Sequence, residues 1–343
     1  MNNFVSKLKL GKQLGKGHFG DVFLGDDAVH GEVAVKVMSR KPGEADTDWI
    51  KRKDGLLAEA QNLKKATHPN VVQVYHCAQR DDGESIQLSM DFCKGGSLQA
   101  AFDKGPMRLS AVRKAGTEVS LGLQSLHHRG MLHRDIKPGN ILVSGNGVAR
   151  LGDFGLVTDD LVVGYGSAAG YSDHIAFEVW QTFTTSAKSD IWALGMTIYR
   201  LLHGKVWYGE APNPAALVKK GGFAATLKFL PHVPQRWRRA IRKMMHDDSS
   251  VRYQSVDQVL AAFSKLPVDL DWDCSVTGTQ VCWQRVTKGR RIIVEWDRHS
   301  ARKHEWRAWS EPLGSGRKHT LGGSTGIVGS AQAARELEAF FES

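Results

Sequence analysis

The stretch that decides the fold is His133-Arg134-Asp135-Ile136-Lys137-Pro138-Gly139-Asn140. It packs a carboxylate, cations and an amide closely together, which is too polar for a core and too apolar in its flanks for a linker. Asp153-Phe154-Gly155 follows it. Phosphoryl transfer needs an acceptor for a hydroxyl proton, oxygen ligands for magnesium and positive charge on the phosphate. Asp135 can supply the first and Asn140 with Asp153 the second. Lys137, together with Lys36, can supply the third.

Two upstream features could contact phosphate groups. Gly15-Lys16-Gly17-His18-Phe19-Gly20 lies between strand-like segments, and its glycines would let backbone amides approach phosphate oxygens. The pattern alone is weak, but its strand-to-strand setting argues against a dinucleotide site, which would open a helix. Lys36 ends the apolar run Val33-Ala34-Val35-Lys36, where a buried ammonium needs a partner. Glu59, in a helical segment, is the expected partner; a solvent-facing edge lysine is the alternative.

The spacing of apolar residues predicts three parts of the chain. Strands are expected at 8–14, 22–25, 33–38, 71–77 and 86–92, with a helix at 55–66. Helices follow at 111–128, 189–203 and 236–246. Strands return at 281–286, 291–296 and 305–309, before a helix at 331–341. We therefore expect an α+β protein with a β-rich lobe at 1–93, a helical lobe at 94–266 and a small accessory α+β domain at 267–343, which contains a flexible Gly/Ser-rich connection at 314–330.

In this order and spacing, the motifs resemble the eukaryotic-type protein kinase family over about residues 8–265. Asp190-Ile191-Trp192-Ala193-Leu194-Gly195 extends the resemblance, because its aspartate supports the catalytic loop in that family. Arg252 is similar to a late arginine of the family, which would pair here with Glu178. The resemblance implies the bilobal kinase fold, with ATP and Mg²⁺ as cofactors and a protein as substrate.

The resemblance also implies a role for each site residue. Asp135 would be the catalytic base, Lys137 would steady the transferred phosphate, and Asn140 and Asp153 would hold magnesium. Lys36, fixed by Glu59, would contact the α- and β-phosphates. Val22 and Ala34 would cover the adenine, Met90 would be the gatekeeper, and the backbone of Asp91 and Cys93 would offer hinge hydrogen bonds. The nucleotide site would thus comprise Gly15, Gly17, Gly20, Val22, Ala34, Lys36, Met90, Asp91 and Cys93.

Several departures from the family bear on substrates and control. Ala176-Phe177-Glu178 replaces Ala-Pro-Glu, and Tyr171 stands where the family usually has a threonine. The lysine at position 137, two residues after Asp135, is similar to the residue that serine/threonine kinases have there. Gly139 and Lys94 make arginine-rich substrates less expected than neutral or acidic ones. Kinases that resemble this chain often bind a phosphorylated activation-segment residue with the arginine that is Arg134 here. The expected phosphorylation sites are Ser167 and then Thr158, and a constitutively ordered segment is the alternative.

Composition limits the setting of the protein. The 343 residues include 46 Lys and Arg against 36 Asp and Glu, which favours anionic partners without choosing among them. The four cysteines form no CxxC pair, so a disulfide framework is not expected. The most apolar stretch, 191–202, is too short to span a membrane, and no signal-peptide pattern opens the chain. We expect a cytoplasmic protein without membrane contact.

The tail after residue 266 permits three interpretations. Tryptophans interleave with cations there, namely Trp272, Trp283, Trp296, Trp306 and Trp309 beside Arg285, Lys288, Arg290, Arg291, Arg302 and Lys303. Such a set can bind nucleic acid, but the alternation of Ile292, Val294 and Trp296 favours tryptophans in the core of a small sheet. Zinc binding by Cys274, Cys282, His299 and His304 is the least expected, because the cysteine spacing does not fit a zinc finger.

These observations predict a serine/threonine protein kinase that transfers the γ-phosphoryl of Mg-ATP to protein hydroxyls and phosphorylates itself. A stress, toxin-like or antiviral role would rest on analogy alone. The alternatives are a pseudokinase that serves as an ATP-binding scaffold and a kinase regulated by nucleic acid through its tail.

Overall fold

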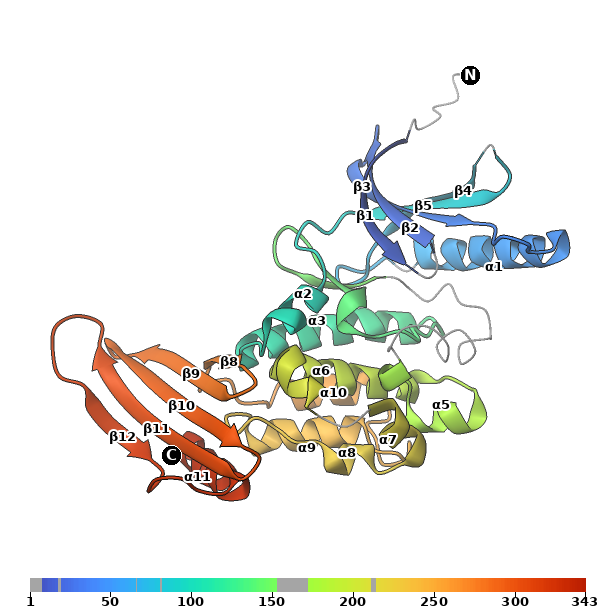
Figure 1. The fold of residues 1–343 in the computed structure, drawn as a ribbon. Helices are drawn as coiled ribbons and strands as arrows, with labels where there is room; N and C mark the ends of the chain where they lie inside the picture. Colours follow the sequence, from blue (N-terminus) through green and yellow to red (C-terminus); the bar gives the residue numbers. More distant parts are fainter. Residues whose placement is uncertain (1–7, 18–19, 66, 81, 153–171, 211–213) are drawn as a thin grey trace.

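Two lobes and a C-terminal domain make up the chain (Figure 1). The computed structural model describes residues 8–17, 20–65, 67–80, 82–152, 172–210 and 214–343. A five-stranded antiparallel sheet forms the small lobe, helices dominate the large lobe, and a second five-stranded sheet with one helix forms the C-terminal domain. This architecture confirms the predicted bilobal α+β fold with a strand-plus-helix accessory domain.

The small lobe is a sheet with the strand order β1-β2-β3-β5-β4. Its strands are β1 Lys9–Gly17, β2 Gly20–Asp27, β3 Gly31–Ser39, β4 Val74–Gln79 and β5 Ser85–Asp91, and α1 Asp46–Lys65 lies beside them. The central strand β3 is buried from Val33 to Met38, as expected for an apolar run that is covered on both faces. Lys36 therefore lies inside the lobe.

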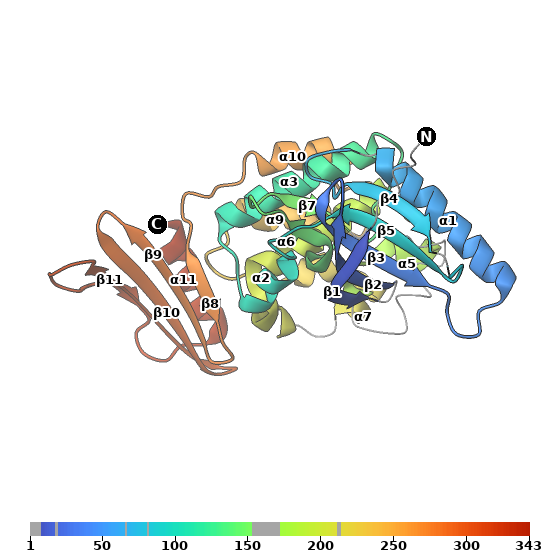
Figure 2. The ribbon, with the colours of Figure 1, turned by 90° about the horizontal axis from the view of Figure 1, so that it is seen from above.

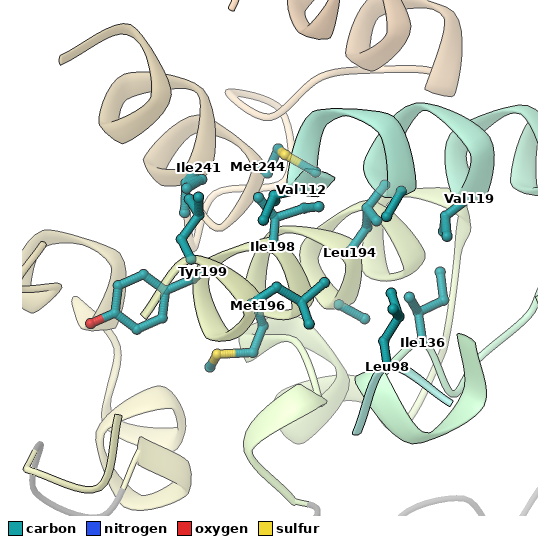
Figure 3. Packing of buried hydrophobic residues seen from close by; sticks show 14 of the residues in the cluster. Leu98, Val112, Val119, Ile136, Leu194, Met196, Ile198, Tyr199, Ile241 and Met244 are labelled. Atoms are coloured by element: carbon teal, nitrogen blue, oxygen red, sulfur yellow. The ribbon is translucent and has the colours of Figure 1, made fainter. Parts of the chain in front are cut away.

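The large lobe is built around α6, Ala187–Gly209. Every residue of α6 from Ser189 to Gly204 is buried, and Figure 3 shows its side chains packed between those of α3 and α9. Ser186 and Ser189 form a capping box at its start, which satisfies amide groups that the first helical turn leaves unpaired. The other elements are α2 Leu98–Lys104, α3 Leu109–His127, η1 Pro138–Asn140, β6 Ile141–Val143, β7 Ala149–Leu151, η2 Ser172–His174, α5 Phe177–Thr182, α7 Pro214–Lys220, α8 Phe223–Thr226, α9 Gln235–Met244 and α10 Val256–Phe263.

The accessory domain is a sheet in the order β12-β11-β10-β9-β8 with α11 against it. Its elements are β8 Asp273–Val276, β9 Gln280–Thr287, β10 Arg290–Ser300, β11 Lys303–Pro312, β12 His319–Gly323 and α11 Ser330–Glu342. Trp272, Trp283, Trp296 and Trp306 are buried, and Phe341 of α11 contacts the rings of Trp272 and Trp283. The interpretation of these tryptophans as a core is therefore confirmed.

Some element boundaries differ from the sequence-based expectation. The helix expected at 55–66 begins at Asp46, where Asp46 and Asp48 in the first turn complement the helix dipole. The expected flexible connection at 314–330 is wrong in its middle, because β12 pairs there with β11. Polar and glycine-rich composition hid this edge strand, whose pairing depends on a neighbour rather than on its own sequence.

The boundary at residues 266–267 is packed against the large lobe. Trp237 of α9 donates its indole N–H to the Pro267 carbonyl oxygen at 2.8 Å, and Arg108 pairs with Asp273. Both views place the accessory sheet at the end of the large lobe away from the small lobe (Figures 1 and 2). Within the described residues, no helix has the length and apolar character to cross a bilayer.

Candidate active site

One carboxylate holds residues 133–140, which correspond to the catalytic loop in the family resemblance. Asp190, at the start of α6 and 1% exposed, accepts hydrogen bonds from the backbone N–H groups of His133 at 2.9 Å and Arg134 at 2.8 Å. His127 Nε2 lies 2.8 Å from the same carboxylate. Arg134 adopts a left-handed conformation with φ of 69°, which is unfavourable for a non-glycine residue. The bonds to Asp190 hold this conformation, as the resemblance implied for that aspartate.

Three predicted site residues, Asp135, Lys137 and Asn140, contact one another in this loop. The Lys137 ammonium and the Asn140 side-chain amide donate to Asp135 Oδ2 at 2.8 Å and 2.6 Å. Asn140 Nδ2 also donates to the Asp135 carbonyl oxygen at 2.8 Å. Asp135 is 6% exposed, and its Oδ1 takes no part in these contacts. The cluster can therefore hold a carboxylate in one orientation toward a hydroxyl proton.

Asn140 connects the catalytic loop to the second predicted metal ligand. Its carbonyl oxygen accepts from Gly152 N at 2.9 Å, and His133 Nε2 lies 3.2 Å from the Gly152 carbonyl oxygen. Gly152 is directly followed by Asp153, which lies outside the described residues together with Phe154 and Gly155. Because Asn140 uses Nδ2 toward Asp135, its amide Oδ1 fits the hard oxygen donor that Mg²⁺ prefers.

Four of the residues predicted to bind the nucleotide lie on three adjacent strands. Val22 of β2 pairs with Lys36 of β3, and Ala34 of β3 pairs with Met90 of β5. Lys36 is 5% exposed and interacts with other groups in the protein, so the alternative of a solvent-facing edge lysine is wrong. Glu59 belongs to α1. The pairing of Lys36 with Glu59 stays a prediction.

The glycine-rich segment is a hairpin between strands, as predicted. Gly15 pairs with Val22, and Gly17 pairs with Gly20 across the turn. Gly20 has a φ of 134°, and a Cβ atom there would lie 2.3 Å from the Val37 carbonyl oxygen. Only glycine tolerates both conditions. His18 and Phe19 lie outside the described residues.

The hinge between the lobes follows Met90. The Asp91 N–H donates to the Gln73 carbonyl oxygen at 3.0 Å, so the backbone of Asp91 would have to accept a hydrogen bond from adenine through its carbonyl oxygen. Cys93 is buried, which raises the pKa of its thiol to about 11. The thiol is therefore protonated at neutral pH, and only the backbone of Cys93 is suited to polar recognition.

The segment 172–178, which would support the substrate, makes one contact that the resemblance implied and others that the sequence did not predict. Arg252, buried completely, makes two hydrogen bonds of 2.7 Å and 2.6 Å with Glu178, as the resemblance implied. A separate contact joins Arg200 of α6, which lies 2.6 Å from His174 Nε2 and 3.7 Å from Asp173. Burial lowers the pKa of His174 to about 4. The only sequence signal was an arginine within an apolar helix.

The predicted regulatory residues are only partly described. The Arg134 side chain is exposed. Ser167, Thr158 and Tyr171 lie outside the described residues. Control by phosphorylation stays a prediction.

Three of the six basic residues that suggested nucleic acid make contacts within the accessory domain. Arg285 lies over the Trp272 ring, Arg290 bonds to Ser310, and Arg291 pairs with Glu311. No cluster of three or more metal-ligating side chains occurs in the described part of the chain, which includes the four residues considered for zinc. Zinc binding there is not supported by the geometry.

Comparison with known proteins agrees with this site. A family model described as protein kinase domain matches residues 8–262. Cell division control protein 7 of Schizosaccharomyces pombe is 36% identical over 220 residues, which is 63% of this chain and 20% of that protein. CBL-interacting serine/threonine-protein kinase 5 of Arabidopsis thaliana is 30% identical over 259 residues, which is 72% of this chain and 55% of that protein.

A third relative, serine/threonine-protein kinase ssp1 of Schizosaccharomyces pombe, is 26% identical over 279 residues, which is 74% of this chain and 42% of that protein. The aligned segments thus span less than two thirds of each of these relatives. The family model covers well over half of this chain, and the Asp135 cluster has the geometry that its motif requires. The chain belongs to the protein kinase family.

Proposed function

We propose that this chain is a serine/threonine protein kinase that transfers the γ-phosphoryl group of Mg-ATP to protein hydroxyls. The observation that carries the proposal is the contact of Lys137 and Asn140 with the carboxylate of Asp135. The relatives named as serine/threonine kinases support the choice of hydroxyl. Lys137, two residues after Asp135, supports it as well.

The mechanism follows from the arrangement around Asp135. Its fixed carboxylate would accept the proton of the substrate hydroxyl while the hydroxyl oxygen bonds to the γ-phosphorus. The bond from that phosphorus to the β–γ bridging oxygen would break in the same step, and ADP would leave with this oxygen. Lys137, 2.8 Å from Oδ2, places positive charge where negative charge develops on the phosphoryl oxygens. Lys36 would hold the α- and β-phosphates from the β3 side. Transfer thus depends on positioning and charge rather than on covalent chemistry by the protein.

Asn140 and Asp153 would hold magnesium, which when bound neutralises charge on the phosphate oxygens. Asn140 suits this role because its Nδ2 atom is already directed to Asp135, which fixes the amide plane. Asn140→Asp would replace the donor Nδ2 by an oxygen that repels Asp135, so the orientation of both side chains would suffer.

The substrates proposed are neutral or acidic proteins, including the kinase itself. Gly139, next to Asn140, and Lys94, which follows the hinge, offer no negative charge to an arginine-rich peptide. A cytoplasmic location is proposed on composition, and the four cysteines are free, which is consistent with a reducing compartment.

The competing function is an ATP-binding scaffold that does not transfer phosphate. Tyr171 and Phe177, which stand where the family usually has other residues, favour this alternative, and the Asp135 cluster argues against it. Regulation by nucleic acid through the accessory domain is less favoured, because buried tryptophans such as Trp283 and Trp296 cannot stack on bases.

Transfer of radiolabelled phosphate from ATP to casein-type acidic substrates and to the kinase itself tests the proposal. Asp135→Ala should lower turnover by about a hundredfold to ten-thousandfold, because proton acceptance belongs to the transition state, and ATP affinity should stay near wild type. Asp103→Ala is the matched control, since Asp103 is a partly exposed carboxylate paired with Lys205. Nucleotide binding without transfer by the wild-type protein would establish the scaffold instead.

A further inference from the structure

Three polar side chains meet behind the hinge. Asp91, at the end of β5, accepts hydrogen bonds from the Tyr75 hydroxyl of β4 and from the Gln73 backbone N–H at 3.1 Å. Its Oδ2 atom also lies 2.5 Å from Arg150 Nη1 of β7. The hinge carboxylate is therefore held by groups from both lobes.

The ion pair of Asp91 with Arg150 crosses from the small lobe to the large lobe. β7 bonds to the segment before β4, because Val72 N donates to the Leu151 carbonyl oxygen at 2.8 Å. It also leads directly to Gly152, whose N–H donates to Asn140. Arg150 thus connects the hinge to β7, the strand that leads to the proposed metal-binding segment.

The surroundings make this contact stronger than an ordinary surface pair. The side chains of Arg150 and Asp91 are 25% and 19% exposed, so solvent screens them only partly. Arg150 Nε has no hydrogen-bond partner among the described residues, which leaves Asp91 as the acceptor on which the guanidinium depends. Burial and the Asp91 carboxylate raise the pKa of Tyr75 to about 12, so its hydroxyl stays a donor at neutral pH.

We propose that Arg150 is a positioning residue for the nucleotide, which acts by fixing Asp91 and thereby the hinge backbone that receives the adenine. The inference rests on the proposed function, since it needs adenine at the hinge. The side chain of Arg150 acts through Asp91 rather than on the phosphates, so its effect should be confined to the adenine end of the site.

A second ion pair near the hinge provides a matched control. Lys94, just after the hinge, lies 2.6 Å from Glu32 of β3, and the two side chains are 63% and 51% exposed. Pairs this exposed contribute little to stability. Lys94→Met therefore removes a cation near the hinge without removing a buried contact.

The experiment separates the two ends of the nucleotide by calorimetric titration of the full chain. Adenosine probes the hinge, and inorganic tripolyphosphate probes the phosphate end. Arg150→Met and Asp91→Asn should each weaken adenosine binding about three- to thirtyfold, as expected for loss of a partly buried ion pair, and leave tripolyphosphate binding within twofold. The KM for ATP should rise with little change in kcat. Arg150→Lys should recover part of the loss, and Lys94→Met should match wild type.

The double variant Arg150→Met with Asp91→Asn should bind adenosine no more weakly than the worse single variant, because both remove the same contact. Unchanged adenosine affinity in a folded Arg150→Met would overturn the inference, as would an equal loss for adenosine and tripolyphosphate. If wild type binds neither adenosine nor tripolyphosphate, the proposed function itself fails. Failure of the proposed function is thus seen in the wild type, whereas failure of the inference about Arg150 is seen only in the variants.

Discussion

At the residue scale, the Asp190 carboxylate organises three groups that lie far before it in the sequence. Its carboxylate receives the amides of His133 and Arg134 and contacts the imidazole of His127. Both amides belong to the residues directly before Asp135. The position of the Asp135 carboxylate, the proposed catalytic base, therefore depends on a buried side chain much later in the chain.

Asp190→Asn should lower kcat at least about tenfold, because the amide would turn an N–H group toward one of the backbone donors. An unsatisfied buried donor costs roughly 1–3 kcal/mol, so the melting temperature should fall as well. Phosphotransfer assays and thermal melts of the wild type and of Asp190→Asn check both effects. Asp257→Asn, which changes an exposed aspartate that bonds to Gln124, is the control, and equal behaviour of the two variants would contradict the role given to Asp190.

At the scale of elements, glycines decide how closely α3 approaches its neighbour. A Cβ atom on Gly122 of α3 would lie 2.4 Å from the Asn70 carbonyl oxygen. That oxygen accepts the Leu151 N–H at 2.9 Å, so it cannot move without disturbing β7. Gly55 of α1, by contrast, has open space around its Cα atom. The same substitution should therefore have opposite effects at the two sites.

Gly122→Ala should lower the free energy of unfolding by about 1–3 kcal/mol, because the extra methyl group overpacks a backbone contact. Gly55→Ala should raise it by up to about 1 kcal/mol, because alanine is the better helix former. Urea unfolding of both variants measures the two signs. If Gly122→Ala stabilised the protein as Gly55→Ala does, α3 would not pack against residue 70 as described.

Local sequence predicted elements well where their chemistry is local. The catalytic loop, the glycine hairpin and β3 could all be located from residue type and spacing. Contacts such as Asp91 with Arg150, or Asp173 with Arg200, join residues far apart in the chain, and no local pattern indicates them. The start of α1 and the edge strand β12 were missed because their residues are polar, and their structure depends on tertiary partners.

At the scale of the whole molecule, the accessory domain and the large lobe share one core. The Trp283 indole N–H donates to His232 Nδ1 at 2.9 Å, and the His232 ring lies 6.1 Å from that of Phe341. Arg298 of β10 pairs with Glu210 at 2.9 Å. Apolar and charged contacts together favour a fixed joint over a flexible tether.

Calorimetry of the full chain should therefore show the accessory domain and large lobe unfolding in one transition. Phe341→Ala should remove about 3 kcal/mol of stability, as expected for truncation of a buried phenylalanine, and should shift that transition as a whole. A matched change on the exposed surface, Leu321→Ala on β12, should have little effect. A separate low-temperature transition of the accessory domain would contradict the shared core.

Buried histidines should make this joint sensitive to acid. Burial lowers the pKa of both His203 and His232 to about 3, against about 6.5 in the unfolded chain. Below pH 6.5 the unfolded chain binds protons that the folded chain excludes, so stability is complete above this pH and decreases as pH falls. At pH 5 each histidine should cost about 2 kcal/mol.

Urea unfolding between pH 7 and pH 5 checks the acid effect. His232→Gln can still accept the Trp283 N–H through its amide oxygen, and it should make the loss of stability with falling pH shallower. His319→Gln, on the exposed edge strand β12, should leave the pH slope as in wild type. Identical slopes for the wild type and His232→Gln would show that this histidine is accessible to protons in the folded state.

The shared core also determines how rotation of the small lobe can be measured. With the accessory sheet packed on the large lobe on the side away from the small lobe (Figures 1 and 2), these two parts form one fixed body, against which any rotation of the β1–β5 sheet would be measured. A dye attached to α11 then reports the position of the fixed body, and a second dye on β4 reports that of the β1–β5 sheet. Energy transfer between them would follow the angle of the small lobe alone during each catalytic cycle.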